Sequence, residues 1–221
     1  MGRYDGLLLD HDGVVVDVLD RDRVRRAAIE AFEAVGVRSP ADDHVELVAF
    51  GPTHDELRAM GDRVGFDPAA LWRHRDDNLA VALKDAALNG GKEPYPDVSV
   101  LADLDVPTGI VSNNQRRIVE FIADQYGLTD HFGTTRAREP RIESLERKKP
   151  SPTFLEQAID DLGVTDPLYV GDRESDVIAG DRTGVDTAFI RRDHNSDVTL
   201  DRQPTHEVGS LEAIPELLDT Q

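Results

Sequence analysis

The stretch LLLDHDGVVVD, residues 7–17, decides the fold: a short apolar run is followed by Asp10 and Asp12, and then by Gly13. An apolar run of this length, ended by turn residues, is typical of a strand buried in a parallel sheet. In such sheets the ligand site lies beyond the carboxyl ends of the strands. The two aspartates therefore belong either to a functional site or, as the simpler alternative, to a solvated turn that the glycine permits.

The rest of the chain alternates between strand-like and helix-like segments. Strands are predicted at Gly6–Leu9, Thr108–Val111, Leu168–Val170 and Thr187–Ile190. Helices are predicted at 115–126, at 152–162 with Ser151 as N-cap and Pro152 at the first position, and at 211–218. This alternation predicts an α/β fold, a Rossmann-like parallel sheet with helices on both faces.

The interval after the first strand breaks this alternation. Helix-period segments at Arg23–Val35, Asp55–Val64 and Pro68–Leu88 follow one another without a convincing buried strand. The stretch NGGKEPYP, residues 89–96, is typical of a linker. We therefore predict a core domain of residues 1–17 and 95–221, interrupted by an α-helical domain of residues 18–94.

Composition limits the functional classes. The chain has 221 residues and no cysteine, so that any metal must be bound by oxygen or imidazole ligands. No stretch approaches the about 18 apolar residues of a membrane span, and no secretion signal is evident, which predicts a cytoplasmic protein without a membrane partner. The sequence leaves the oligomeric state open.

The charge is strongly acidic. Thirty Asp and 14 Glu face 21 Arg and 4 Lys, which gives a net charge of −19. Concentrated salt screens the mutual repulsion of so many acids, and the composition resembles that of halophilic proteins. The acids are scattered, which favours this interpretation over a binding site for a basic partner, and the negative field argues against nucleic-acid binding.

Polar residues also mark the ends of later strands. Ser112 ends the second predicted strand, Lys149 precedes a proline-initiated helix, and Asp172 and Asp176 follow the strand at 168–170. Each has an ordinary structural explanation: a helix cap, a solvated lysine, or acids that favour a helix N-terminus. Together, however, they each fall at the end of a predicted strand or at the start of a predicted helix.

In this order the residues resemble the haloacid dehalogenase superfamily of phosphohydrolases, over essentially the whole chain. The motifs are D-x-D-G at Asp10–Gly13, the strand-terminal Ser112, Lys149 within K-P-x-P, and G-D-x-x-x-D at Gly171–Asp176. The helical insertion lies where members of this superfamily carry a C1 cap. Among them the chain resembles the phosphoglycolate phosphatases.

The resemblance implies a role for each motif. Asp10 would be the nucleophile that forms an aspartyl phosphate, and Asp12 the general acid and base. Lys149 would neutralise Asp10 and the phosphoryl group, whose oxygens Ser112 and the amide of Asn113 would bind. The dehalogenases of the superfamily lack an acid at the position of Asp12, so this residue favours a phosphatase.

The resemblance also implies a Mg²⁺ cofactor. Asp10, the backbone carbonyl of Asp12 and Asp172 would coordinate the ion, with Asp176 in its outer shell. A shared cation is needed because a carboxylate and a phosphate dianion otherwise repel each other.

Two further segments bear on the substrate. The stretch FGPTHDELRAM, residues 50–60, resembles the cap segment that contacts substrate, which makes Thr53 and His54 candidate substrate-binding residues. Sugar-phosphate mutases of similar architecture carry an arginine about where this chain has His54. The arginines in the polar stretch Thr135–Lys148 could attract anionic substrates, but they more simply balance the local charge.

The predicted function is a Mg²⁺-dependent phosphatase that hydrolyses a small phosphate ester, such as phosphoglycolate or a sugar phosphate. The alternative within the superfamily is a sugar-phosphate mutase. A receiver-type signalling module is disfavoured because Asp172 and Asp176 follow Lys149, and because a receiver has no place for a helical insertion. A non-catalytic binding protein is disfavoured because all the acidic motif positions are intact.

Overall fold

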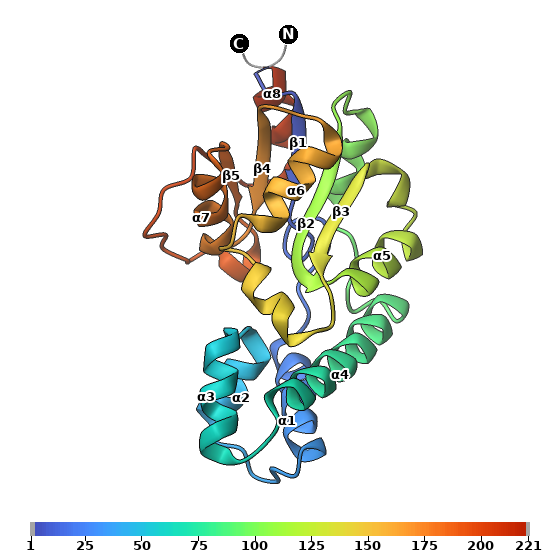
Figure 1. Ribbon diagram of the computed structural model, residues 1–221. Coiled ribbons are helices and arrows are strands. Elements are labelled where there is room, and N and C mark those ends of the chain that lie inside the picture. The colour runs from blue at the N-terminus through green and yellow to red at the C-terminus, as the bar shows by residue number, and fades with distance from the viewer. Residues whose placement is uncertain (1–2, 220–221) are drawn as a thin grey trace. The chain divides into compact units, whose positions relative to one another are not determined.

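The computed structural model describes residues 3–219, and its centre is a six-stranded sheet in the order β3-β2-β1-β4-β5-β6 (Figure 1). The strands are β1 (Gly6–Leu9), β2 (Thr108–Gln115), β3 (Thr134–Arg138), β4 (Pro167–Gly171), β5 (Thr187–Ile190) and β6 (His206–Val208). β1 pairs in parallel with β2 and β4, β4 with β5, and β5 with β6. This is the strand order of a Rossmann sheet, with β1 and β4 at the centre.

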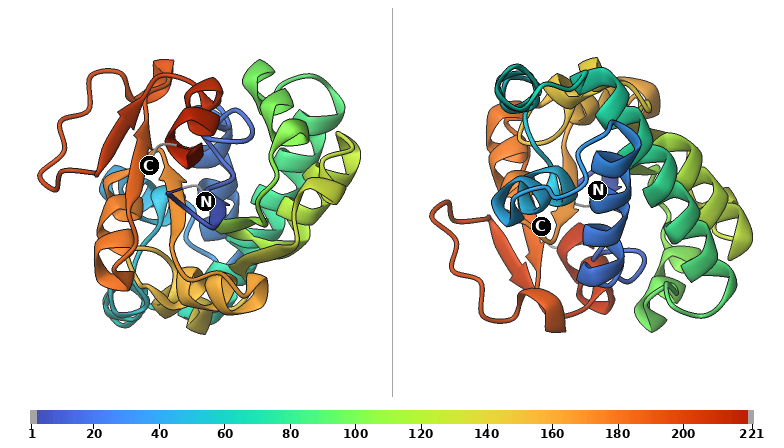
Figure 2. Two further views of the ribbon diagram at one scale, coloured as in Figure 1. Left: turned by 90° about the horizontal axis from the view of Figure 1, so that it is seen from above. Right: turned by 90° about the horizontal axis from the view of Figure 1, so that it is seen from below.

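Helices cover both faces of the sheet, which confirms the predicted α/β class. They are α5 (Arg116–Gln125), α6 (Thr153–Leu162), α7 (Glu174–Thr183) and α8 (Ile214–Asp219). α6 and α7 pack together on one face, and α5 and α8 lie on the other (Figure 2). Covered in this way, β1, β4 and β5 are buried along their whole length, so their sequences are apolar runs rather than alternating patterns.

Some predicted elements need correction. β3 and β6 were not predicted, because both are edge strands whose residues are largely polar and partly exposed. The prediction of Ser151 as N-cap was wrong: α6 begins at Thr153, one residue later, and Pro152 occupies the cap position. The hydroxyl of Ser151 instead pairs with that of Thr153 at 2.9 Å.

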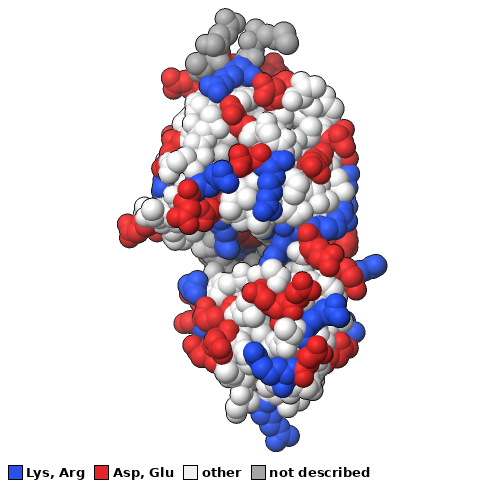
Figure 3. Space-filling view, turned by 60° about the vertical axis from the view of Figure 1, so that its left-hand side comes forward, with Lys and Arg blue, Asp and Glu red and all other residues white. Residues whose placement is uncertain are grey.

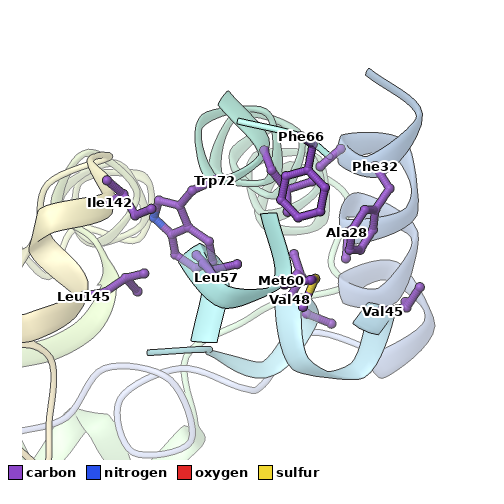
Figure 4. Close-up of a cluster of buried hydrophobic side chains, with 13 residues drawn as sticks. Ala28, Phe32, Val45, Val48, Leu57, Met60, Phe66, Trp72, Ile142 and Leu145 are labelled. Carbon is purple, nitrogen blue, oxygen red and sulfur yellow. The ribbon is translucent and has the colours of Figure 1, made fainter. Parts of the chain in front are cut away.

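A second compact unit consists of residues 19–92 together with 138–147. Its helices are α1 (Arg21–Ala34), α2 (Asp42–Phe50), α3 (His54–Val64) and α4 (Pro68–Leu88). Three of them were predicted; α2 was not. Phe32, Leu57 and Trp72 form part of the apolar cluster that holds these helices together (Figure 4).

Residues 138–147 were assigned to the core domain, because the helical domain was predicted to end at residue 94; in the structure they belong to the helical unit. Ile142 and Leu145 are buried in the same apolar cluster as Trp72 (Figure 4). Arg138 donates two hydrogen bonds of 2.8 Å to the buried carboxylate of Asp76 in α4. The segment therefore packs with the helices, although it begins at the last residue of β3.

The surface carries the charge that the composition implies. On the face drawn in Figure 3, acidic side chains are spread widely and lie among basic ones rather than in a single patch. Within residues 3–219, no helix combines the length and the apolar content needed to cross a membrane.

Candidate active site

Three buried carboxylates meet beyond the ends of the two central strands. Asp10 follows β1, Asp172 follows β4, and Asp176 lies in the first turn of α7. One oxygen of each lies within 4.8 Å of those of the other two. Because β1 and β4 are neighbours in a parallel sheet, their carboxyl ends bring these acids together.

The ammonium group of Lys149 lies within this cluster. Its Nζ is 3.0 Å from Oδ1 of Asp10 and 2.8 Å from Oδ1 of Asp176. It also donates to the carbonyl oxygen of Val111 at 2.9 Å and to the hydroxyl of Tyr169 at 2.8 Å. The Tyr169 hydroxyl in turn donates to Oδ1 of Asp176 at 2.9 Å, so that the lysine is fixed by several contacts at once.

Burial and charge change the acidity of these groups. Burial raises the pKa of Asp10 to about 8; Asp176 and Asp172 add to this rise, and Lys149 opposes it. Burial alone would lower the pKa of Lys149, but Asp10 and Asp176 raise it above its ordinary value. Lys149 is therefore cationic, and it faces an excess of carboxylates.

Side chains at the end of β2 form hydrogen bonds to Lys149 and to Asp12. Asn113 exchanges two hydrogen bonds with the backbone of Lys149, donating to its carbonyl oxygen at 3.0 Å and accepting from its amide at 2.7 Å. The Nδ2 group of Asn114 donates to Oδ2 of Asp12 at 2.9 Å. The hydroxyl of buried Ser112 accepts from the amide of Asn114 at 3.1 Å. Asp12 is thus held in place by the strand next to its own.

Two glycines allow this close packing. Gly13 has a φ of +86°, and a Cβ atom there would lie 2.3 Å from Oδ2 of Asp172. A Cβ atom on Gly171 would lie 2.2 Å from the Cβ of Asp176. A side chain at either position would displace a carboxylate of the cluster.

The cluster suits a divalent cation that prefers oxygen ligands. Three carboxylates face one ammonium group, and among the described residues Oδ1 of Asp172 is buried without a hydrogen-bond partner. A buried oxygen of this kind costs free energy unless it is paired, and a bound cation would pair it. The donor set therefore fits Mg²⁺.

The two candidate residues of the helical unit lie at the start of α3. Thr53 caps this helix by accepting from the amide of Glu56 at 3.2 Å. Nδ1 of His54 lies 2.9 Å from a carboxylate oxygen of Glu146, in the segment of residues 138–147. A role of Thr53 and His54 in substrate binding stays a prediction.

Sequence reasoning missed four residues of the site: Asn114, Tyr169, His194 and Asn195. The first two lie next to motif residues, where their side chains could have been considered: Asn114 follows Ser112 by two positions, and Tyr169 precedes Gly171 by two. His194 and Asn195 follow β5, and each forms a hydrogen bond to Asp172. Nothing in the local pattern of that loop indicates such contacts.

The chain is similar in sequence to known hydrolases. Residues 4–184 match the model of the haloacid dehalogenase-like hydrolase family. A phosphoglycolate phosphatase of Neisseria meningitidis is 31% identical over 139 residues, which cover 58% of this chain and 57% of the relative; the chain thus spans little more than half of that protein's length. A phosphoglycolate phosphatase of Aquifex aeolicus is 25% identical over 83% of each chain.

Solved structures share the fold. CbbY from Rhodobacter sphaeroides in complex with phosphate superposes with a TM-score of 0.73 at 17% identity, covering 98% of this chain and all of the other. A mutant of CbbY in complex with xylulose-(1,5)bisphosphate gives a TM-score of 0.70 at 17% identity, with the same coverage. With a family match over most of its length, the chain belongs to the haloacid dehalogenase-like hydrolases.

Proposed function

We propose that the protein is a Mg²⁺-dependent phosphatase that hydrolyses a small phosphorylated metabolite through an aspartyl phosphate on Asp10. The observation that carries the proposal is the buried cluster of Asp10, Asp172 and Asp176 around Lys149, with Asp12 held beside it. Phosphoglycolate is the first substrate to test, because two relatives are named phosphoglycolate phosphatases. Sugar phosphates come next, because a mutant of CbbY, which shares the fold, was solved in complex with xylulose-(1,5)bisphosphate.

The proposed reaction has two steps. A carboxylate oxygen of Asp10 attacks the phosphorus, and the bond from phosphorus to the ester oxygen breaks as Asp12 gives that oxygen a proton. Water then attacks the aspartyl phosphate and loses a proton to Asp12, and the bond to Asp10 breaks, which releases phosphate. The second step restores the proton of Asp12 and the carboxylate of Asp10, so the ester and one water molecule are the only reactants consumed.

The remaining residues bind and orient. Lys149 balances the charge of Asp10 and of the phosphoryl group, and Ser112 and the amide of Asn113 bind phosphoryl oxygens. Asp10, the carbonyl of Asp12 and Asp172 would hold Mg²⁺, with Asp176 behind them; bound there, the ion offsets the repulsion between nucleophile and phosphate.

The test is phosphate release from a panel of phosphorylated metabolites in molar KCl, with and without Mg²⁺. Metal-dependent release from one or a few compounds supports the proposal and identifies the substrate class. Transfer of phosphate between two positions of a sugar, without net release, would instead indicate a mutase. Absence of both reactions across the panel would contradict the proposed activity.

We expect Asn114→Ala to lower kcat by about 10-fold or more while leaving KM nearly unchanged. The substitution removes the hydrogen bond that orients Asp12; while Asp12 is charged, as it is when water attacks in the second step, such a bond is worth about 1.5–3 kcal/mol. The control is the same substitution in an Asp12→Ala background, where it should have little further effect. Additive losses in that double variant would show that Asn114 acts by another route.

A further inference from the structure

The loop after β5 brings an imidazole to the carboxylate cluster. Nε2 of His194 lies 2.7 Å from Oδ2 of Asp172. An ionised carboxylate only accepts hydrogen bonds, so the imidazole is the donor. The other oxygen of Asp172, Oδ1, is the buried atom that has no hydrogen-bond partner among the described residues. One oxygen is therefore held by His194, while the other remains free.

The loop that carries His194 is itself anchored. Asn195 is buried, and its side-chain Nδ2 donates to the backbone carbonyl oxygens of Asp172 at 2.8 Å and of Ile190 at 3.0 Å. The side chains of two adjacent residues therefore hold Asp172 at two points: Asn195 binds its backbone carbonyl oxygen, and His194 binds its carboxylate.

A second anchor ties this loop to the rest of the core. Arg192 forms two hydrogen bonds to the carboxylate of Asp97, at 2.7 and 3.0 Å, and donates to the carbonyl oxygen of Val14 at 3.2 Å. Burial alone would raise the pKa of Asp97, but hydrogen bonds from Arg192, Leu211 and Ser210 lower it below its ordinary value. The paired charges therefore anchor the loop to the segment that contains Asp97.

Gly13 lies against the pair of His194 and Asp172. A Cβ atom at Gly13 would be 2.3 Å from Oδ2 of Asp172 and 3.0 Å from Nε2 of His194. The imidazole, the carboxylate and the loop that contains Asp12 are thus packed in contact. Rotation of the Asp172 carboxylate would require the loss of the histidine hydrogen bond.

We propose that His194 is a positioning residue for the cation: it fixes Oδ2 of Asp172 so that Oδ1 is presented to the metal. The inference rests on the proposed Mg²⁺ site. Partners that orient a metal ligand contribute to affinity although they do not touch the ion, and their loss weakens binding about 10–100-fold. His194 would therefore set the cation affinity of the enzyme rather than its chemical step.

The test is direct binding of Mg²⁺ by calorimetry, and of Mn²⁺ by the electron paramagnetic resonance signal of the free ion. We expect His194→Leu to raise the Kd for both ions about 10–100-fold. His194→Gln keeps an N–H donor and should recover most of the affinity. The control is His131→Leu. His131 belongs to the same unit but lies in the 3₁₀ turn at Thr129–His131, so this variant should bind both ions like wild type. In turnover, kcat of His194→Leu should approach the wild-type value at saturating Mg²⁺.

Each failure has a distinct signature. If wild type and Asp172→Asn bind Mg²⁺ equally weakly, the proposed metal site is wrong, and the role of His194 is overturned together with it. If wild type binds and both His194 variants bind equally well, only the role of His194 is overturned. Nitrogen coupling to bound Mn²⁺ that disappears in His194→Leu would also overturn it, because the histidine would then be a direct ligand. Should His194→Leu unfold, His194→Asn takes its place: its shorter side chain does not reach Oδ2 of Asp172, so a wild-type Kd in that variant would overturn the role of His194.

Discussion

Asp10→Asn should abolish phosphate release, lowering kcat by at least about 10⁴-fold, while the protein remains folded. The amide has the shape of the carboxylate but cannot attack phosphorus. The fold should tolerate it because the change removes one of three crowded carboxylates. The thermal midpoint in the absence of metal should be no lower than that of wild type. The measurements are phosphate release on the best substrate of the panel and thermal unfolding by circular dichroism.

The matched control is Asp124→Asn, the same chemical change at an exposed position of α5, which should leave turnover unaltered. A variant at Asp10 that retains most of its activity would contradict the assignment of the nucleophile. Acid-quenched wild-type enzyme provides a second criterion: phosphate should be bound covalently to wild type during turnover, and Asp10→Asn should carry none.

Much of this site is predictable from sequence because it depends on strand ends. Asp10 and Asp172 each follow an apolar run, and in a parallel sheet such positions share one edge. The neighbouring pair β1 and β4 then brings the two aspartates together. Lys149 could be expected there only through the order of the motifs, since no strand precedes it directly.

The contacts that the sequence does not indicate arise from loops that fold back. His194 meets Asp172 across 22 positions of the chain, and Asn114 meets Asp12 across 102. No periodic pattern in the sequence indicates either contact, because each depends on the path that the chain takes after a strand. The edge strands β3 and β6 were missed for a related reason: half-exposed strands lack the continuous apolar run that identified the others.

Residues 138–147 show the same limit within the helical unit. The 3₁₀ turn at Ile142–Arg147 is too short to show a helical pattern in the sequence. Arg138, at the start of the segment, binds Asp76, which lies 62 positions earlier in the chain. Polar residues dominate the segment, so its arginines were interpreted as balancing the local negative charge. Arg138 is instead buried, with 2% of its surface exposed.

Asp76→Ala should lower the free energy of unfolding by about 3–5 kcal/mol. Asp76 is fully buried and accepts hydrogen bonds from Arg138 and, at 3.1 Å, from Arg75. Both guanidinium groups also lie over the ring of Trp72, at 4.7 and 4.9 Å from its centroid. Removing the carboxylate leaves two cations buried side by side, and neither can reach water without disrupting the cluster.

The control is Asp62→Ala, an exposed aspartate of α3, which should change the unfolding free energy by no more than about 0.5 kcal/mol. The measurement is urea unfolding, followed by hydrogen exchange of residues 138–147. We expect exchange to accelerate there first, because Arg138 also donates to Ser144 and to the carbonyl of Glu139, and so links the start of the segment to its 3₁₀ turn.

A second variant separates the charge from the packing. Replacing Arg75, Asp76 and Arg138 together by Met, Leu and Met removes all three charges while keeping apolar volume, and should restore most of the stability that Asp76→Ala loses. If the single variant loses less than about 1 kcal/mol, the buried ion pair does not hold the segment, and the apolar contacts of Ile142 and Leu145 must suffice. If the triple variant is as unstable as the single one, the geometry of the hydrogen bonds, rather than the balance of charge, fixes residues 138–147 on the helices.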